Sequence, residues 1–204
     1  MADKCPTCGE EFYVVGKHIH SCGYPKLSDK KKDILKGCLM GDASIDRRDG
    51  DNNARWTLYN TNHDYLKYVE DKLGVLASTR MKEDKEFLPQ KTTYATGMTH
   101  PWLENLAGWY STGEKVFPES IELTPTVLKH WYCCDGNTDV SERFCITVEN
   151  EKNNKDKLIN YFNERGFHID KRANKIYANK ELAKEIFNYM GSPPDGMSYK
   201  WPNS

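Results

Sequence analysis

Two short segments of the chain share a pattern that could place paired acids at helix ends. Residues 35–43 form an apolar run that contains Asp42, and residues 128–136 repeat the profile with Asp135, 93 positions further along. Small residues spaced by four lie on one face of a helix and let a second helix approach closely. We therefore expect the two helices to pack together with both acids at their C-terminal tips. The small residues at the expected contact are Gly37, Gly41 and Cys134.

Paired carboxylates at such a place point to a metal site. Two carboxylates at close quarters repel each other unless a cation lies between them, and hard oxygen ligands favour Mg²⁺. An acid at a helix C-terminus also opposes the helix dipole. Because Asp42 and Asp135 both accept this cost, a functional reason is favoured over a merely structural one.

The first 23 residues carry a second set of metal-ligand types. Cys5 and Cys8 are separated by two residues, and His18 and Cys22 by three. A C-x2-C turn offers two thiolates on one side, and an i, i+4 pair lies on one face of a short helix. The spacing predicts a closed structural zinc site in a small knuckle, with Phe12 over its core. His20 could replace His18 as a ligand, although H-x-C is awkward on one helix face. The other cysteines, Cys38, Cys133, Cys134 and Cys145, are expected to be ordinary buried thiols.

The elements that must position these residues occur in two copies. Each acid is followed by a hairpin, an amphipathic helix, a second strand pair, a closing helix and a lysine close to a proline. The first copy places these elements at 43–61, 64–76, 78–85 with 91–98, 100–110 and Lys115. The second copy places them at 137–149, 154–166, 167–172 with 175–180, 181–191 and Lys200. Ser28 or Asp29 is expected to cap the first motif helix, so the knuckle is predicted to be an appendage.

Composition excludes several classes of protein. The chain has 204 residues, 38% hydrophobic and 29% charged, and no apolar run long enough to span a bilayer. The 12% aromatic content argues against wholesale disorder, and an odd number of cysteines, seven, argues against a pure disulfide framework. The N-terminus lacks a signal-peptide layout, so we expect an intracellular protein, not a secreted one. Net charge is −1, but residues 116–151 balance at −5 and residues 152–184 at +5.

With these segments in order, residues 33–204 resemble the LAGLIDADG homing endonucleases of the monomeric, double-motif, intron-encoded type. GCLMGDASI is similar to the first motif and keeps its Gly and Asp. HWYCCDGN is a looser match, with His130 where the family usually has a small residue. GEKVFP and MSYKWPN are similar to the family's two lysine-proline segments.

The resemblance implies an α+β fold of two pseudo-symmetric αββαββα units, whose sheets form a β-saddle over the DNA major groove. The expected domains are a zinc finger or knuckle at 1–26, a first unit at 27–118 and a second unit at 119–204. Both motif helices are supplied by one chain, so the resemblance implies a monomer with no obligate protein partner and no membrane association. The implied partner is double-stranded DNA.

The activity that the resemblance implies is site-specific double-strand cleavage of DNA. One phosphodiester on each strand of a long target site would be hydrolysed, leaving short 3′ overhangs. Mg²⁺ would be the cofactor, with Mn²⁺ as a substitute, while Zn²⁺ in the knuckle would be structural. The implied catalytic residues are Asp42, Asp135, Lys115, Lys200, Asn60 and Glu149. The implied metal ligands are Asp42 and Asp135, with the backbone carbonyls of Gly41 and Cys134.

Base and phosphate contacts are expected from the strands, because Arg and Lys in a groove bind guanine and phosphate. Aromatic residues, Trp56, Tyr59 and Tyr94, are interleaved with them. The candidates are Arg47, Arg48, Arg55, Arg80, Lys82, Lys85, Lys91, Arg143, Lys171, Arg172 and Lys175.

Two other classes were weighed against the enzyme. A catalytically reduced relative could bind nucleic acid as an RNA maturase or a DNA-binding regulator, and such a descendant can dispense with the acid pair. Both acids are present here, which favours the enzyme. An intein is not expected, because no splicing segments flank the domain.

Overall fold

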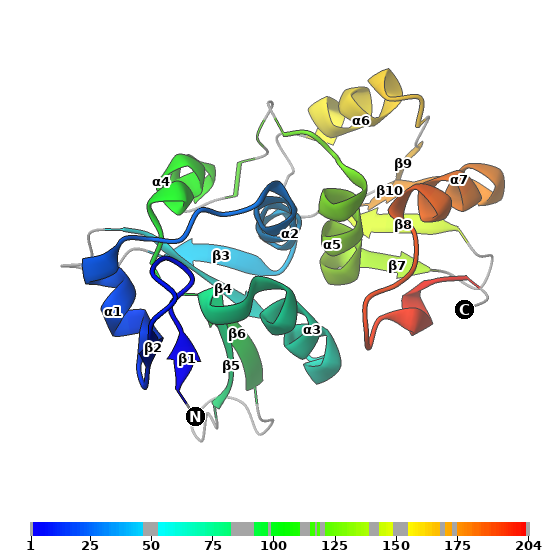
Figure 1. The fold of residues 1–204 in the computed structure, drawn as a ribbon. Helices are drawn as coiled ribbons and strands as arrows, with labels where there is room; N and C mark the ends of the chain where they lie inside the picture. The colour runs from blue at the N-terminus through cyan, green and yellow to red at the C-terminus, as the bar shows by residue number, and fades with distance from the viewer. Residues whose placement is uncertain are drawn as a thin grey trace.

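The computed structural model describes residues 2–46, 53–82, 92–97, 99–110, 115–116, 118, 121–138, 143–148, 155–167, 170–172 and 175–202. A small knuckle at the N-terminus is followed by two units of the same plan, and the motif helices α2 and α5 lie side by side between them (Figure 1).

The first unit has the order helix, two strands, helix, two strands, helix. Its antiparallel sheet has the strand order β3-β4-β6-β5. Its helices and strands are α2 (Asp29–Met40), β3 (Ala43–Asp46), β4 (Arg55–Tyr59), α3 (His63–Leu73), β5 (Ala77–Lys82), β6 (Thr92–Gly97) and α4 (Pro101–Ala107). Single 3₁₀ turns, η1 (Gly74–Leu76) and η2 (Gly108–Tyr110), follow α3 and α4.

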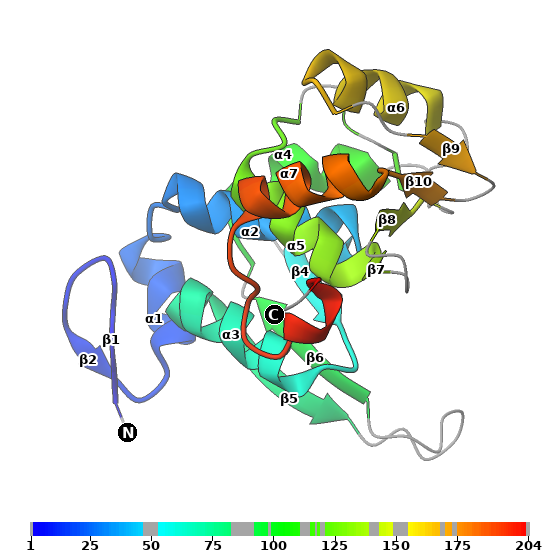
Figure 2. The ribbon, with the colours of Figure 1, turned by 90° about the vertical axis from the view of Figure 1, so that its right-hand side faces the viewer.

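The second unit repeats this plan. Its sheet has the order β7-β8-β10-β9, which is the same path through four strands (Figure 2). Its elements are α5 (Pro125–Asp135), β7 (Gly136–Thr138), β8 (Phe144–Thr147), α6 (Lys155–Glu164), β9 (Asp170–Arg172), β10 (Lys175–Tyr177) and α7 (Lys180–Met190), with a 3₁₀ turn η4 (Ser198–Lys200). The predicted α+β fold of two αββαββα units is therefore confirmed.

A side-chain cap begins each motif helix, and at the first helix it is Ser28, one of the two predicted candidates. Ser28 accepts a hydrogen bond from the Lys31 backbone N–H, and Thr124 accepts one from Val127. The second helix of the first unit is shorter than predicted. It ends at Leu73 because Gly74 adopts a φ of +62°, a conformation that suits glycine and stops the helix.

Strand β4 shows how the sheet divides its side chains between two faces. Trp56 and Leu58 are buried, whereas Arg55, Thr57 and Tyr59 are on the more open face. Although the sequence interleaves Trp56 with the basic residues of the strands, alternation turns its indole inward, against Gly97. Tyr59, by contrast, is half exposed and pairs across the strands with Tyr94.

The two motif helices approach closely, as their small residues predict. A Cβ added at Gly37 would lie 2.5 Å from the Val127 carbonyl oxygen and 2.6 Å from His130 Cβ. One turn later, Gly41 packs against Cys134 in the same way. The buried side chains of both units form one continuous apolar core around this pair.

His130 fits at this interface because the residue opposite it, Gly37, has no side chain. The residue is buried, packs against Gly37, and its Nδ1 lies 2.8 Å from the Tyr65 hydroxyl. A hydrogen-bonded imidazole can therefore replace a small residue without leaving an unsatisfied polar group in the core.

The knuckle is an appendage with its own small core, as predicted. It consists of β1 (Asp3–Lys4), β2 (Glu11–Phe12) and α1 (Val15–Cys22), and it lies at the outer side of the first unit (Figure 1). Its buried side chains, Cys5, Val15 and Ile19, form a cluster separate from the main core.

Tyr24 connects the knuckle to the first unit. The Asn53 amide donates to the Tyr24 hydroxyl at 3.0 Å, and the same hydroxyl is hydrogen-bonded to His20 Nδ1 at 2.9 Å. The His100 ring stacks edge-on against Tyr24, and its Nε2 donates to the Pro25 carbonyl at 3.1 Å. These contacts give the appendage a defined attachment.

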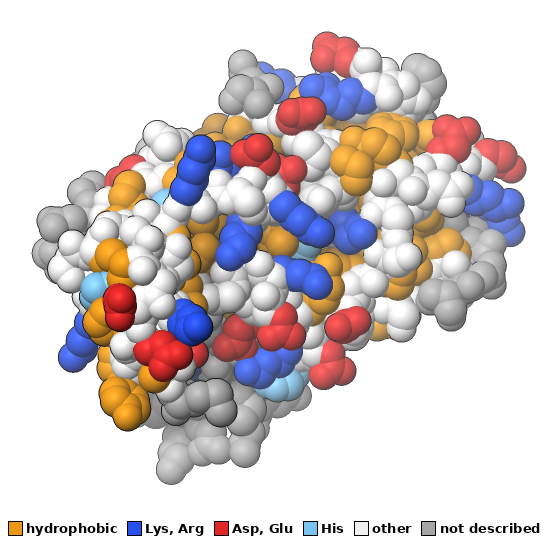
Figure 3. Space-filling model, viewed as in Figure 1, with side chains coloured by type: hydrophobic (Ala, Val, Ile, Leu, Met, Phe, Trp, Pro, Cys, Tyr) orange, Lys and Arg blue, Asp and Glu red, His pale blue; other side chains and the backbone are white. Residues whose placement is uncertain are grey.

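The charge blocks of the sequence do not divide the visible surface into an acidic and a basic half. On the face shown in Figure 3, Lys and Arg side chains gather over the region of α2 and α5, with acidic side chains among them. Among the described residues, no helix is both long enough and apolar enough to cross a bilayer.

Candidate active site and metal centres

The two predicted acids lie at the same end of the motif helix pair. Asp135 is the last residue of α5, and Asp42 follows α2 directly after the capping residue Gly41. The Asp135 carboxylate is 3.4 Å from the position that a Cβ on Gly41 would occupy. The close approach of the helices therefore places Asp135 of the second unit against Gly41, the residue that precedes Asp42 in the first unit.

Asn60 holds the Asp42 carboxylate. Its Nδ2 donates to Asp42 Oδ2 at 3.1 Å, and its Oδ1 accepts from the backbone N–H of Asn62 at 2.9 Å. Since the second bond requires the oxygen on that side, the amide orientation is determined. Asn60 follows β4 directly, so the end of a strand orients an acid at the end of a helix.

The surroundings make the Asp42 carboxylate a good partner for a cation. Burial of the carboxyl raises its pKa, although the residue as a whole is exposed, while Lys200, Asn60 and Lys115 oppose the rise. A carboxylate that has lost part of its hydration gains more from a nearby positive charge.

A lysine lies at the C-terminus of each motif helix. Lys115 Nζ donates to the carbonyls of Met40, at 3.1 Å, and Gly41. The corresponding atom of Lys200 donates to the carbonyls of Cys133, at 2.7 Å, and Cys134, at 3.2 Å. The last carbonyls of a helix lack intrahelical partners and carry partial negative charge, so an ammonium group suits this place.

The donor set at the helix ends fits a divalent cation. The residues that would hold it are Asp42 and Asp135, with the carbonyls of Gly41 and Cys134, and all of these offer hard oxygen atoms. The positively charged nitrogens of Lys115 and Lys200 already lie on those carbonyls. The two ammonium groups therefore show that these carbonyl oxygens attract positive charge.

The predicted DNA-contacting residues, together with the predicted catalytic residue Glu149, fall into several groups. Arg80 is exposed on β5, opposite Tyr94, and Lys175 is on β10. Arg55 is less available than predicted, because it donates to Asp46 at 3.0 Å and only 20% of its side chain is exposed. Arg143 immediately precedes β8. Lys82, Lys171 and Arg172 are on strands with only their backbone described, and Arg47, Arg48, Lys85, Lys91 and Glu149 lie outside the described residues.

Two tyrosines were missed by the sequence reasoning. The Tyr110 hydroxyl lies 2.8 Å from the Leu39 carbonyl oxygen and 3.0 Å from that of Ala43, on either side of the α2 terminus. Tyr132 donates to the Lys200 carbonyl at 3.0 Å and so holds the segment that carries the second lysine. Tyr132 is inside the second motif and could have been noticed, whereas no local pattern marks Tyr110.

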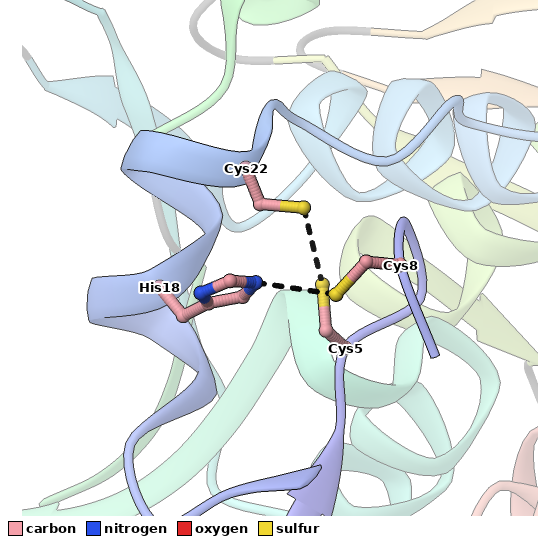
Figure 4. A group of neighbouring side chains, drawn as sticks. All are labelled: Cys5, Cys8, His18 and Cys22. Carbon is pink, nitrogen blue, oxygen red and sulfur yellow. Dashed lines mark hydrogen bonds between the residues drawn. The ribbon is translucent and has the colours of Figure 1, made fainter. Parts of the chain in front are cut away.

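The predicted zinc ligands come together in the knuckle (Figure 4). The turn after β1 supplies Cys5 and Cys8, and α1 supplies His18 and Cys22 from successive turns. Cys5 and Cys22 Sγ are 3.9 Å apart, Cys8 Sγ is 3.3 Å from His18 Nε2, and all four ligand atoms lie within 4.8 Å of one another. Tetrahedral zinc with Zn–S bonds of about 2.3 Å places its sulfur ligands about 3.8 Å apart, so the group could bind zinc.

The neighbours of the Cys/His cluster favour His18 over His20. Phe12 stacks on the His18 ring at 3.6 Å between centroids. His20 is instead hydrogen-bonded to Tyr24. Burial, followed by the neighbouring sulfurs of Cys8 and Cys5, raises the pKa of Cys22 to about 11. Burial also acts on Cys5, but hydrogen bonds from the backbone N–H groups of Cys8 and Thr7 outweigh it and lower the pKa of that thiol to about 7. The Cys5 thiolate therefore forms readily, whereas Cys22 gives up its proton more easily once a metal ion compensates the charge. Outside the knuckle, Cys38, Cys133 and Cys145 are buried, as predicted, and Cys134 is partly exposed.

We expect one zinc ion per chain, bound through His18. His18→Ala should remove zinc from the purified protein, because a three-ligand site is open and binds more weakly. His20→Ala is the matched control in the same helix and should keep full zinc content. Metal analysis of the two variants checks this. Zinc retained by His18→Ala and lost by His20→Ala would reverse the ligand assignment.

The chain was compared with known proteins. The sequence profile described as LAGLIDADG DNA endonuclease family matches residues 32–186, while no curated protein sequence matches. The homing endonuclease I-WcaI, solved bound to its DNA recognition sequence, has a similar fold: the TM-score is 0.75 at 18% identity, over 93% of this chain and 92% of that one. The meganuclease I-AabMI, solved bound to uncleaved DNA, is much less similar, with a TM-score of 0.38 at 12% identity over 71% and 76% of the two chains. The profile match spans most of the chain and both motif helices, and the chain therefore belongs to the LAGLIDADG DNA endonuclease family.

Proposed function

We propose that this protein is a site-specific, metal-dependent homing endonuclease that cleaves both strands of a long DNA target and leaves short 3′ overhangs. One observation carries the proposal. Two motif helices, packed side by side, each end in an acid, a pair of polarised carbonyls and a lysine from a distant segment. Duplicated machinery of this kind suits the cleavage of two strands.

The roles of the residues follow from what each one touches. Asp42 and Asp135 would hold a divalent cation, which when bound would supply the Lewis acidity that activates water at neutral pH. Asn60 keeps the Asp42 carboxylate oriented, because its amide nitrogen donates to that oxygen. Lys115 and Lys200 supply positive charge beside the scissile phosphates. Glu149 is proposed as the counterpart of Asn60 in the second half.

The DNA is proposed to lie across the open faces of the two sheets. In the first sheet this face presents Thr57, Tyr59, Tyr94 and Arg80 on neighbouring strands. Such a surface combines hydroxyl groups, aromatic rings and a cation, which can contact base edges and phosphates in the major groove. The exposed Arg80 is the described basic side chain best placed for this in the first unit.

The same proposal covers the organisation of the chain. The three domains span 1–26, 27–118 and 119–204, and the protein acts as a monomer, because the helix pair that joins the two units is provided within one chain. The knuckle extends the contact with DNA beyond the saddle.

The decisive experiment is cleavage of a plasmid that carries the intronless junction of the host gene. Linear product is expected with Mg²⁺ or Mn²⁺ and none with EDTA. A parallel plasmid interrupted by the intron should stay intact. Binding of the junction without cleavage in any divalent ion would instead support a DNA-binding regulator.

Removal of the knuckle tests its contribution to DNA binding. Deleting residues 1–23 should leave the main core folded, because the two apolar clusters are separate. Affinity for the target should fall by about tenfold, equivalent to about 1.4 kcal/mol, while cutting persists at high enzyme concentration. Gel shift on full-length and truncated protein measures this, with thermal unfolding as the check on folding. Equal affinities would mean that the knuckle does not contact DNA.

A further inference from the structure

The lysines at the helix ends occupy the same backbone oxygens that the proposed metal site requires. Lys115 contacts the carbonyls of Met40 and Gly41, and Lys200 contacts those of Cys133 and Cys134. The two carbonyl pairs are equivalent, because Gly41 precedes Asp42 just as Cys134 precedes Asp135. The arrangement therefore occurs twice, through the lysine that follows the closing helix of each unit.

Each lysine satisfies a local electrostatic need. The final carbonyls of α2 and α5 carry the negative end of the helix dipole, and an acid follows or ends each helix. The two helix termini also lie against each other, since the Asp135 carboxylate is 3.4 Å from the position that a Cβ on Gly41 would occupy. The two ammonium groups thus act together on one negatively charged cluster.

A divalent ion and an ammonium group cannot share one carbonyl at full strength. A Mg²⁺ ion lies about 2.1 Å from its oxygen ligands and repels a second positive charge next to it. An ion that uses the carbonyls of Gly41 and Cys134 must therefore displace Lys115 and Lys200. The displaced side chains need an anionic partner, and a DNA phosphate at the same place provides one.

We propose that Lys115 and Lys200 are placeholders that cap the motif helices until DNA and a divalent ion arrive together. The inference rests on the proposed function, because it assumes that the acid pair binds the ion. Binding of the ion and binding of DNA then depend on each other. A DNA phosphate draws the lysines away from the helix carbonyls, and those carbonyls become available to the ion. By linkage, each ligand must then raise the affinity for the other by the same factor.

The test uses the full chain and Ca²⁺, which can occupy an oxygen site, first without DNA. Lys115→Met and Lys200→Met should each lower the melting temperature, because a helix terminus loses its cap. Both should bind Ca²⁺ more tightly than the unaltered protein does, by at least about tenfold, and Ca²⁺ should restore the melting temperature. Titration calorimetry and thermal unfolding give both quantities.

Lys129→Met is the matched control for the loss of positive charge alone. Lys129 is on α5, with its ammonium near Gly191 and away from the α5 terminus, so its replacement should leave Ca²⁺ affinity unchanged. If it raises Ca²⁺ affinity as much as Lys115→Met does, general electrostatics explain the result and the proposal is wrong. Unchanged stability and affinity in Lys115→Met and Lys200→Met would overturn it equally.

The junction duplex of the cleavage experiment supplies the second arm. In the unaltered protein, the affinity for Ca²⁺ should rise when the duplex is bound. In the Lys115→Met, Lys200→Met double variant, binding of the duplex should raise the affinity for Ca²⁺ little or not at all. An undiminished increase in the double variant would contradict the exchange. Failure of the proposed function is distinguishable, because absence of cleavage by the unaltered protein leaves the DNA-free measurements of lysine displacement valid.

Discussion

Replacing either acid at the helix tips by its amide should abolish most double-strand cleavage while leaving DNA binding intact. Asp42→Asn and Asp135→Asn each remove a negative charge from the proposed metal site with little change in volume. Metal affinity and activation of water should fall, so cleavage should drop by at least about a hundredfold, or about 2.7 kcal/mol of transition-state stabilisation. Binding should survive or tighten, because a carboxylate that faces a phosphate repels it.

The two substitutions need not be equivalent. Asp42 accepts a hydrogen bond from Asn60, whereas the proposed counterpart of Asn60 in the second half is Glu149. One variant is therefore expected to nick a preferred strand. Gel shift and plasmid nicking on the same preparations measure binding and cleavage separately.

Asp29→Asn is the matched control for the acid substitutions. Asp29 is the first residue of α2, the helix that precedes Asp42, so it lies at the end of the helix away from the acid pair. Its exposed side chain pairs with Lys32. Cleavage by this variant should be unchanged. Undiminished linear product from the folded Asp42→Asn, Asp135→Asn double variant would rule out the proposed metal site.

The second large effect is expected from a side chain placed between the motif helices. Gly37→Val puts a branched side chain where a Cβ alone would lie 2.5 Å from the Val127 carbonyl oxygen. Neither that oxygen nor the nearby His130 Cβ can move aside by changing a side-chain rotamer. Overpacking of this kind costs about 3 kcal/mol, which lowers the melting temperature by about 6–12 °C in a protein of this size.

Gly108→Ala is the control variant, because it also replaces a glycine but puts no side chain into a packed interface. Gly108 has helical backbone angles, φ −59° and ψ −21°, and no atom lies within 4 Å of an added Cβ. The change should be neutral or stabilise by up to about 1 kcal/mol. Thermal and urea unfolding of both variants give the comparison. A Gly37→Val protein as stable as the parent would mean that the two helices are not in close contact.

Local spacing was sufficient to predict features that depend on a few neighbouring residues. The candidate zinc ligands form two short pairs, and the i, i+4 relation of His18 and Cys22 already places them on one helix face. The same holds for the Ser28 cap and for the repeated order of helices and strands. The close approach of the motif helices also followed from sequence, since Gly37 and Gly41 leave room only for another backbone.

The sequence was a poor guide wherever a side chain had to choose between partners. Trp56 is interleaved with the basic candidates in the sequence, but the sheet turns it inward, and Arg55 is partly satisfied by Asp46. Strand alternation gives two faces without saying which one is covered. Only the packing of helices on one side of the sheet decides which face stays open.

At the candidate active site, the sequence by itself determined which residues are present and roughly where each unit places them. The tertiary structure decided that Asn60 orients Asp42, and that Lys115 reaches a carbonyl 74 residues earlier in the chain. Such contacts depend on how loops return to the helix ends after the core has formed. Propensity and periodicity describe neighbours along the chain, whereas these partners are neighbours only because two helices and two sheets pack together.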